Sequence, residues 1–163
     1  MVSKEYIFRA EPRRDDIEDV THLLDGTGFF YNEEIAIAGE LIQERLEKGA
    51  ASGYFFIFAH DRNGKLAGYT CYGPVPLTRS SYDLYWIAVR SGEQGKGLGK
   101  RLLVMSEDDM RSLGGTRVYA DTSSREQYRP TREFYSRSGY REAALLEDFY
   151  APGDGKVIFE KKL

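Results

Sequence analysis

The chain has 163 residues, of which 41% are hydrophobic and 30% charged, and it carries a formal net charge of −3. This length is enough to bury a real core, so one domain spanning residues 1–163 is expected. The negative net charge argues against a general nucleic-acid-binding protein, because affinity for phosphate backbones comes from concentrated Lys and Arg.

The first third of the chain predicts a short strand followed by two helices. Residues 6–10 form the strand, and apolar residues at helical spacing predict a helix that starts near Asp15 and ends at Gly26. Asn32 is a candidate N-cap for the second helix, with two glutamates behind it. The aromatic residues 29–31 lie between the helices and are equally consistent with core packing and with substrate contact.

The middle of the chain predicts three consecutive strands. Residues 54–60 and 65–72 flank the sequence Asp61-Arg62-Asn63-Gly64, whose Asn-Gly pair is typical of a tight hairpin. Residues 82–89 follow as a third strand, with bulky residues at almost every position, as a central strand covered on both faces requires.

The last third predicts two helices, one more strand and a closing hairpin. A helix with Leu102, Met110 and Leu113 on its buried face ends at Gly114, and residues 117–122 form a strand parallel to 82–89 if the crossover is right-handed. A helix over residues 131–138 and a hairpin of 142–150 with 156–162 complete the chain. The element order is therefore β-α-α-β-β-β-α-β-α-β-β.

Cysteine, histidine and apolar runs exclude several classes of protein. The single cysteine, Cys71, cannot form an internal disulfide and is expected to be a buried, inert thiol. His22 and His60 lie far apart in the sequence, so no metal site is expected. The N-terminus lacks an apolar signal segment and no stretch reaches membrane-spanning length, which favours a cytoplasmic location.

A glycine-rich turn after the strand 82–89 carries the main functional signal. Gly95, Gly97 and Gly99 lack the Cβ atoms that would keep a ligand from the backbone, at a point where the first turn of a helix leaves N–H groups unpaired. Such a place attracts phosphate. It is not a P-loop, which needs Lys and then Ser or Thr after its last glycine, nor a dinucleotide fingerprint, which needs a small residue where Lys100 stands.

The motif Gln94-x-x-Gly97-x-Gly99, directly after Ile87-Ala88-Val89, resembles the GNAT superfamily of acyl-CoA-dependent N-acetyltransferases. The resemblance spans nearly the whole chain. It implies an α/β fold of the α+β type, with one mixed, mostly antiparallel twisted sheet of six or seven strands flanked by about four helices.

The resemblance also implies where acetyl-CoA binds. In the family, amides of the glycine turn hold the pyrophosphate and the preceding strand holds the pantetheine arm. The cofactor-binding residues so implied are Ile87, Ala88, Val89, Gln94, Gly95, Lys96, Gly97, Leu98, Gly99, Lys100, Tyr128 and Thr131. Many relatives have asparagine where this chain has Tyr128 and alanine where it has Thr131; Ser123, Ser124 or Thr131 are candidates to replace the asparagine's polar contact.

Acetyl transfer from a thioester to an amine needs a neutral amine, a polarised carbonyl and a proton for the leaving thiolate. A lysine-like amine is neutral in about one molecule per thousand near neutral pH, whereas about a quarter or more of α-amines are neutral there. Asp83 is the carboxylate in the central strand, at a position where the family often has an acidic residue, and is the first candidate base. A strand-end aspartate that only pairs with an arginine or faces water is the alternative. Glu33 and Glu34 are further candidates.

Residues 134–140, Phe-Tyr-Ser-Arg-Ser-Gly-Tyr, match the family signature Phe-Tyr-x-x-x-Gly-Phe/Tyr. In the family that tyrosine lies beside the coenzyme A sulfur, so Tyr135 is the expected proton donor; the alternative is a tyrosine that only packs. Carbonyl polarisation is expected from backbone N–H groups around Ala88 and Val89, freed by a β-bulge.

The function expected is acetyl-CoA-dependent transfer of an acetyl group to a primary amine of a small molecule or amino-acid-like acceptor. The alternatives are a catalytically idle acyl-CoA-binding or sensing module, and an acetyltransferase of protein N-termini or lysines. The expected partners are acetyl-CoA and the amine, with a homodimer left open, and without nucleic acid, membrane or metal. The identity of the acceptor and the use of other acyl groups stay open.

Overall fold

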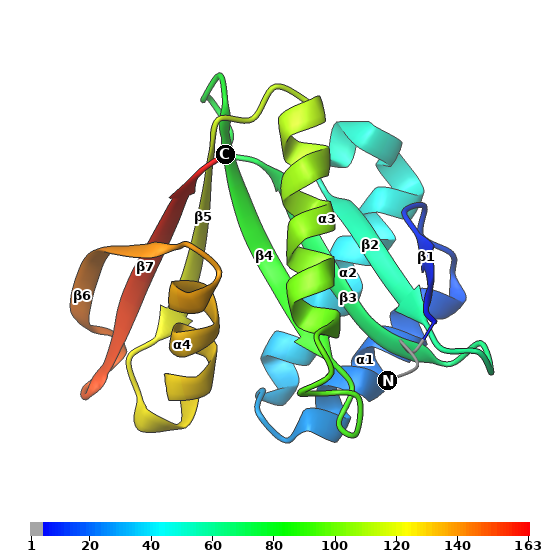
Figure 1. Ribbon diagram of the computed structural model, residues 1–163, viewed down its shortest axis with the longest axis horizontal. Helices are drawn as coiled ribbons and strands as arrows, with labels where there is room; N and C mark the ends of the chain where they lie inside the picture. Colours follow the sequence, from blue (N-terminus) through cyan, green and yellow to red (C-terminus); the bar gives the residue numbers. More distant parts are fainter. Residues whose placement is uncertain (1–4) are drawn as a thin grey trace.

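The computed structural model describes residues 5–163 as one seven-stranded sheet with helices on both faces (Figure 1). The predicted element order and fold class are confirmed. In chain order the elements are β1 (Ile7–Arg9), α1 (Asp15–Thr27), α2 (Asn32–Lys48), the 3₁₀ turn η1 (Gly49–Ser52), β2 (Phe55–His60), β3 (Leu66–Pro74), β4 (Ser81–Val89), α3 (Leu98–Ser112), β5 (Arg117–Ser123), the 3₁₀ turn η2 (Glu126–Tyr128), α4 (Arg129–Arg137), β6 (Arg141–Ala151) and β7 (Asp154–Lys162).

The strands lie side by side in the order β1-β2-β3-β4-β5-β7-β6. Every neighbouring pair is antiparallel except β4 and β5, which are parallel, as the crossover rule predicts. The parallel pairing joins only Ser81–Leu84 to Arg117–Ala120, although both strands continue beyond it. The two strands then separate, and Figure 1 shows the resulting V opening between β4 and β5.

Two hydrophobic cores cover the two faces of the sheet. Leu102, Leu103 and Met110 of α3 are almost completely buried against one face, which α4 also covers. Val20 and Leu24 of α1 and Ile42 of α2 are fully buried against the other. Because helices cover both faces, β3 is buried at every position except its last, Pro74.

A β-bulge at Tyr85 changes which face the end of β4 serves. Cys71 of β3 pairs with Trp86 whereas Tyr72 pairs with Leu84, so Tyr85 is the extra residue. As a result, Leu84 packs in the α3 core while Trp86 and Ala88 pack in the core of α1 and α2. The bulge was expected around Ala88 and Val89, and that expectation is wrong by three residues: both remain paired with β3.

Of three local predictions, the β2–β3 hairpin is confirmed, and those for the N-cap of α2 and for Leu113 are wrong. The Asp61 carboxylate accepts hydrogen bonds from the Asn63 and Lys65 amides at 2.9 and 3.0 Å and closes the β2–β3 hairpin. The N-cap of α2 is Tyr31 rather than Asn32, because the Tyr31 amide donates to the Glu34 carboxylate at 2.8 Å. Leu113, expected on the buried face of α3, follows the helix end and is 48% exposed.

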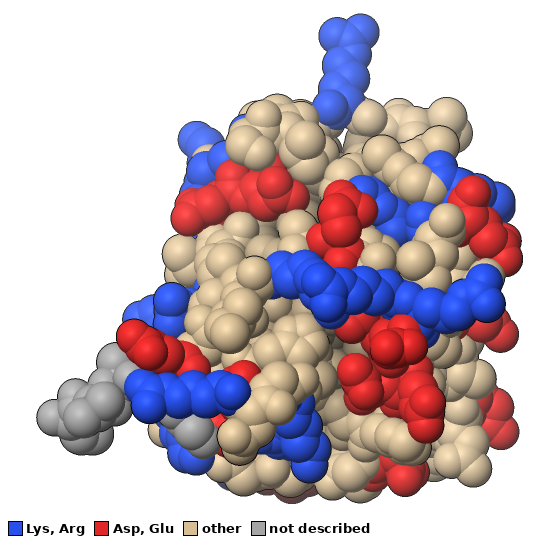
Figure 2. All heavy atoms as spheres, turned by 90° about the vertical axis from the view of Figure 1, so that its right-hand side faces the viewer, with Lys and Arg blue, Asp and Glu red and all other residues tan. Residues whose placement is uncertain are grey.

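The surface and helices of the described chain show two further properties. On the face beside β1, basic and acidic side chains are interspersed (Figure 2). Over residues 5–163, the helices are too short or too polar to cross a bilayer.

A buried ionic network ties α3 to the C-terminal hairpin. The Glu107 side chain is 2% exposed and accepts hydrogen bonds from Lys161 Nζ at 2.9 Å and from the Tyr140 hydroxyl at 3.0 Å. Lys161 also donates to the Ser138 carbonyl at 3.0 Å. One carboxylate therefore connects α3, β7 and the α4–β6 junction.

Glu107→Gln should destabilise the fold by about 1–3 kcal/mol, because the substitution keeps the size of the side chain but removes the ionised acceptor from a buried site. Urea denaturation followed by circular dichroism measures the free energy of unfolding. Asp108→Asn is the matched control: Asp108 is 67% exposed and bonds Arg111 at the surface, so its loss should stay within about 0.5 kcal/mol. Equal losses in the two variants would contradict a structural role for the network.

Candidate active site

A cleft of about 1480 Å³ lies where β4 and β5 separate, and residues from both faces of the sheet line it. On the face covered by α3 and α4 it is lined by Gly97, Gly99, Lys100, Phe134 and Arg137, among others. On the opposite face it is lined by acidic and aromatic residues from α2, β4, β5 and the β6–β7 hairpin. The opening between the strands thus connects two chemically different surfaces.

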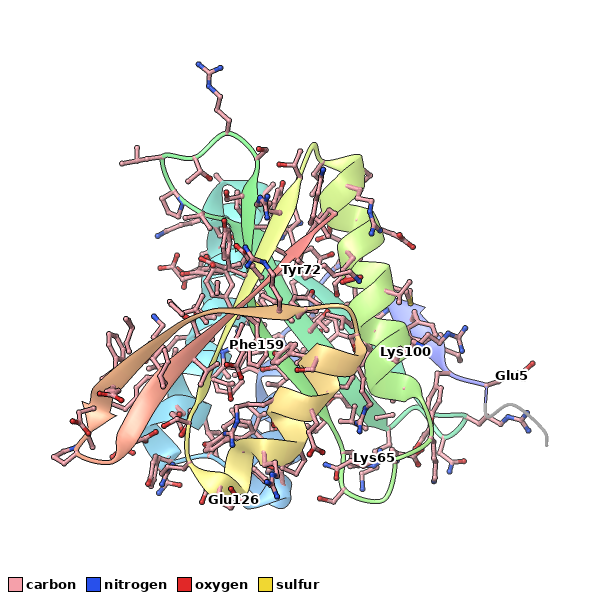
Figure 3. The ribbon with its side chains drawn as sticks, turned by 60° about the vertical axis from the view of Figure 1, so that its left-hand side comes forward. Glu5, Lys65, Tyr72, Lys100, Glu126 and Phe159 are labelled. Carbon is pink, nitrogen blue, oxygen red and sulfur yellow. The ribbon has the colours of Figure 1, made fainter. Side chains whose placement is uncertain are left out.

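The glycine turn forms one end of the cleft. Gly97 is the N-cap of α3 and has a φ of 83°, a left-handed conformation that favours glycine. The first backbone bond into the helix runs from the Arg101 amide to the Gly97 carbonyl at 3.1 Å, so the amides of residues 98–100 have no partner in the helix. Lys100 projects from this first turn (Figure 3). Free amides, a helix N-terminus and a lysine together suit phosphate.

Side chains behind the turn hold it in place. Arg90 donates to the Leu66 carbonyl at 2.7 Å and to the Asp61 carboxylate at 2.8 Å, and it also contacts Glu93 at 3.3 Å. The Gln94 side-chain amide donates to the Val89 carbonyl at 3.1 Å, which anchors the turn to the end of β4. This hydrogen bond of Gln94 therefore fixes the position of the turn relative to β4.

Ten of the twelve predicted cofactor-binding residues line the cleft; Lys96 and Leu98 do not. The Leu98 side chain is 2% exposed in the α3 core, so only its backbone faces the turn. The Lys96 ammonium donates to the Gly92 carbonyl at 2.8 Å. Arg137, at the end of α4, lines the cleft and was missed, because nothing in the sequence indicates that α4 and α3 flank the same opening.

The end of β4 presents backbone donors to the opening. The Arg90 amide bonds the Ala67 carbonyl of the β3 segment, so by strand alternation the amides of Ile87 and Val89 point away from β3. β5 has already separated from β4 at this point. The predicted free donors therefore arise from strand separation instead of a bulge.

Tyr135 lies in the wall of the cleft, on the face covered by α4. Its ring is 5% exposed and packs against Phe159 and Tyr140 at centroid distances of 5.3 and 5.4 Å. Burial, and then the charge of Asp121, raise the pKa of its hydroxyl, which therefore stays protonated at neutral pH. Within residues 5–163 this hydroxyl makes no hydrogen bond, so it is available to a ligand.

Tyr128 joins the two sides of the cleft. Its ring packs edge-on against Phe29 at 5.5 Å and its hydroxyl donates to the Phe29 carbonyl at 3.3 Å. Arg125 contacts the Tyr31 hydroxyl at 3.4 Å and lies over the Tyr128 ring at 5.5 Å. We call Phe29, Tyr31, Arg125 and Tyr128 the aromatic bridge. The sequence left open whether residues 29–31 pack in the core or line a binding site. In the structure they do both: they make aromatic contacts and they line the cleft.

The candidates to replace the family asparagine differ in availability. Ser123 donates its hydroxyl to Asp154, and Ser124 Oγ accepts from the Gly155 amide at 2.8 Å. Thr131 lines the cleft, and its hydroxyl has no hydrogen-bond partner in the described part of the chain. The Tyr128 hydroxyl is engaged by the aromatic bridge. Thr131 is the polar side chain left available.

The predicted base, Asp83, is half-buried in β4 and is not among the residues that line the cleft. Burial, and then the charge of Asp121, raise its pKa, while Lys156 opposes the shift. Asp121 of β5 does line the cleft and pairs with Lys156 at 3.0 Å. The sequence analysis missed Asp121, although the predicted parallel pairing of β4 and β5 places both aspartates on adjacent strands.

The side of the cleft that faces away from α3 and α4 is aromatic and acidic. Its rings come from segments far apart in the sequence, and so do its carboxylates. The side chains are those of Phe29, Phe30, Tyr31, Glu33, Glu34, Tyr85, Trp86, Asp121, Tyr150 and Asp154. Of these, Tyr85, Trp86, Asp121, Tyr150 and Asp154 were not predicted as site residues, because only the tertiary fold brings β5 and the β6–β7 hairpin to the same cleft as the end of β4.

One group of side chains outside the cleft has the composition of a metal site. Ligand atoms of Asp16, Asp19 and His60 lie within 4.8 Å of one another. Both Asp16 oxygens, however, accept hydrogen bonds from the Arg9 guanidinium, at 2.6 and 2.8 Å. Burial and then Arg9 lower the pKa of His60. The group is thus accounted for by an ion pair that joins α1 to β1.

Comparison with known proteins identifies the family. The sequence pattern of the Acetyltransferase (GNAT) family matches residues 17–140. A crystal structure of a GNAT-family protein from Desulfovibrio desulfuricans is 44% identical, with a TM-score of 0.94 over 97% of this chain and 99% of that chain. No curated protein sequence gives a significant match.

More distant structures share the fold. An aminoglycoside 6'-N-acetyltransferase in complex with coenzyme A is 17% identical, with a TM-score of 0.73 over 96% of each chain. The PaiA N-acetyltransferase from Thermoplasma acidophilum, also in complex with coenzyme A, is 19% identical, with a TM-score of 0.73 over 98% of this chain and 99% of that chain. With the family pattern and the 44% identical structure, the conclusion is that this chain belongs to the GNAT family of acetyltransferases.

Proposed function

We propose that the protein transfers an acetyl group from acetyl-CoA directly to a primary amine of a small molecule. The observation that carries this proposal is the cleft through the sheet, which joins a phosphate-suited turn with Lys100 and Arg137 on one face to an acidic, aromatic surface on the other. A polyanionic cosubstrate and a cationic acceptor suit these two ends.

The residues of the cleft divide the chemistry between them. Acetyl-CoA supplies the activated acetyl group, with its pyrophosphate at the amides that follow Gly97. Amides of Ile87 and Val89 polarise the thioester carbonyl. The ammonium group first loses one proton to solvent by way of Asp121, which lines the cleft and has Asp83 on the adjacent strand. The neutral nitrogen then bonds the carbonyl carbon and passes a second proton to Asp121, while the carbon–sulfur bond breaks. Tyr135 donates a proton to the departing thiolate.

The aromatic bridge favours a small acceptor over a protein substrate. Its contacts link the α1–α2 junction to the β5–α4 segment, at separations of 3.3 Å between Tyr128 Oη and the Phe29 carbonyl and 3.4 Å between Arg125 Nη1 and Tyr31 Oη. A peptide bound in an extended groove needs an open edge, and the bridge closes this one. With this edge closed, a small amine suits the cleft better than a peptide.

Gly99→Val should raise the dissociation constant of coenzyme A by about tenfold or more, or about 1.4 kcal/mol. A Cβ at Gly99 meets only ordinary contacts with Val89 and Phe134, at 3.7 and 3.6 Å, so the fold accommodates it while the added methyl groups enter the cleft. Gly97 is a poorer probe, because its φ of 83° would strain any replacement. Isothermal titration calorimetry measures the affinity.

The control is Gly26→Val, the same exchange in α1, where an added Cβ has nothing within 4 Å. Its affinity for coenzyme A should equal that of the unmodified protein. An unchanged affinity in a folded Gly99→Val variant would remove the phosphate site from the proposal.

Tyr135→Phe should lower kcat by about a hundredfold and leave the affinity for coenzyme A nearly unchanged, since general acid catalysis contributes about 10²- to 10⁴-fold and a thiolate is a tolerable leaving group. The ring that packs on Phe159 remains and only the donor is lost. Steady-state kinetics on an amine that releases free thiol from acetyl-CoA measures kcat.

Tyr140→Phe is the matched control, because its ring lies 5.4 Å from Tyr135 while its hydroxyl serves Glu107 and does not line the cleft. This variant should keep kcat and lose stability. If kcat of Tyr135→Phe stays within about threefold, another group donates the proton; if affinity falls as well, Tyr135 is structural.

The pH dependence tests the two aspartates. If Asp83 is the base, the acid limb of kcat/KM should titrate above the ordinary aspartate pKa of 3.8, because burial and the Asp121 charge raise its pKa. Asp121→Asn removes the like charge, so this limb should move to lower pH. A limb that stays in place in Asp121→Asn and also in Asp83→Asn would exclude both from proton transfer.

A further inference from the structure

The side of the cleft that faces away from α3 and α4 carries more negative charge than its own cations offset. Of the residues lining this side, four are carboxylates, Glu33, Glu34, Asp121 and Asp154, whereas Arg125 is the single cation among those described. Arg125 lies 3.2 Å from Asp154, and Lys156 lies 3.0 Å from Asp121. Glu33 and Glu34 are left without an ion pair within residues 5–163, although Glu34 accepts the Tyr31 amide.

Aromatic rings line the cleft beside these carboxylates, and the faces of such rings attract cations. Two cations already lie over rings at this end of the molecule: Lys156 at 4.7 Å from the Phe149 centroid and Arg125 at 5.5 Å from that of Tyr128. Tyr85, Trp86 and Tyr150 present further rings to the cleft. An ammonium group held over an aromatic face and near a carboxylate is stabilised by both.

The negative charges fall into two places. Asp121 stands on β5, with Asp83 beside it on β4, next to the region where the acetyl group would be transferred. Glu33 and Glu34 stand on the first turn of α2, in another wall of the same cleft. Asp121 already pairs with Lys156, whereas Glu33 and Glu34 have no ion pair within residues 5–163. An acceptor amine placed beside Asp121 would therefore gain an additional ion pair if a chain carried a second cationic group to Glu33 and Glu34.

Resting on the proposed function, we propose that the acceptor is a diamine or polyamine: one amino group faces Asp121 and is acetylated, while a second ammonium group is held by Glu33 and Glu34 among the aromatic rings. An amino acid fits less well, because the cation available for its carboxylate, Arg125, already contacts Asp154 and the Tyr31 hydroxyl.

Three ligands with the same five-carbon chain test the inference: cadaverine carries two ammonium groups, pentylamine carries one, and δ-aminovalerate carries an ammonium and a carboxylate. Their binding to the complex of the protein with coenzyme A is measured by isothermal titration calorimetry, which needs no turnover. Cadaverine should bind at least about fivefold more tightly than pentylamine, as an additional charge pair in water provides. The preference should shrink at higher ionic strength.

Glu33→Gln should reduce this preference for cadaverine by about fivefold and leave pentylamine binding unchanged. Glu44→Gln is the matched control, since Glu44 lies on the same helix but pairs with Lys48 at the surface, outside the cleft. Equal affinities for cadaverine and pentylamine, tighter binding of δ-aminovalerate, or no binding of any of the three would overturn the inference.

Thiol release from acetyl-CoA separates this inference from the proposed function. If pentylamine is acetylated as efficiently as cadaverine, the N-acetyltransferase proposal stands and the diamine inference fails. If cadaverine binds selectively but no amine releases thiol, the binding inference stands and the proposed activity fails.

Discussion

The separation of the parallel strands β4 and β5 determines where the candidate active site lies. β4 and β5 share only four residue pairs before they part, and each then continues as a strand whose inner edge has lost its partner. Backbone groups on such an edge need ligands, because unpaired amides away from water are costly. The cleft between β4 and β5 is therefore lined by backbone hydrogen-bond donors. Residues of α2, α3, α4 and the β6–β7 hairpin surround it.

The charges that line the cleft differ between the two faces of the sheet. The face covered by α3 and α4 contributes a helix N-terminus, Lys100 and Arg137, while the other face contributes carboxylates and rings. In the proposed function, the opposite charges of the two sides attract different ligands, whose reactive groups then meet between them. Tyr135 and Asp121 line the cleft from opposite faces of the sheet. Burial contributes most to the raised pKa of Tyr135, and the negative charge of Asp121 adds to it.

The local part of this arrangement could be predicted from the sequence. The glycine turn and the alternation of strands and helices follow from short-range patterns that need no tertiary information. The expectation for Tyr135 came from the resemblance of residues 134–140 to the family signature. The bulge could not be predicted, because Tyr85 becomes the extra residue only through the register that β3 imposes. Asp121, Arg125 and Asp154 became site residues for the same reason: their neighbours in space lie far away in sequence. The contact of Tyr128 with Phe29 spans 99 residues and replaces an expected polar contact to a ligand with a structural one.

The cleft is lined from both faces of the sheet, and this has a kinetic consequence for the proposed reaction. Two ligands that approach from opposite faces do not use the same entrance, so neither has to leave before the other can bind. Under the proposed direct transfer, binding in either order leads to the same ternary complex. Cys71 is completely buried in β3 and does not line the cleft, so its thiol is not placed to carry an acetyl group. Each product can also depart by the entrance its parent used, which leaves the path of the other ligand unobstructed.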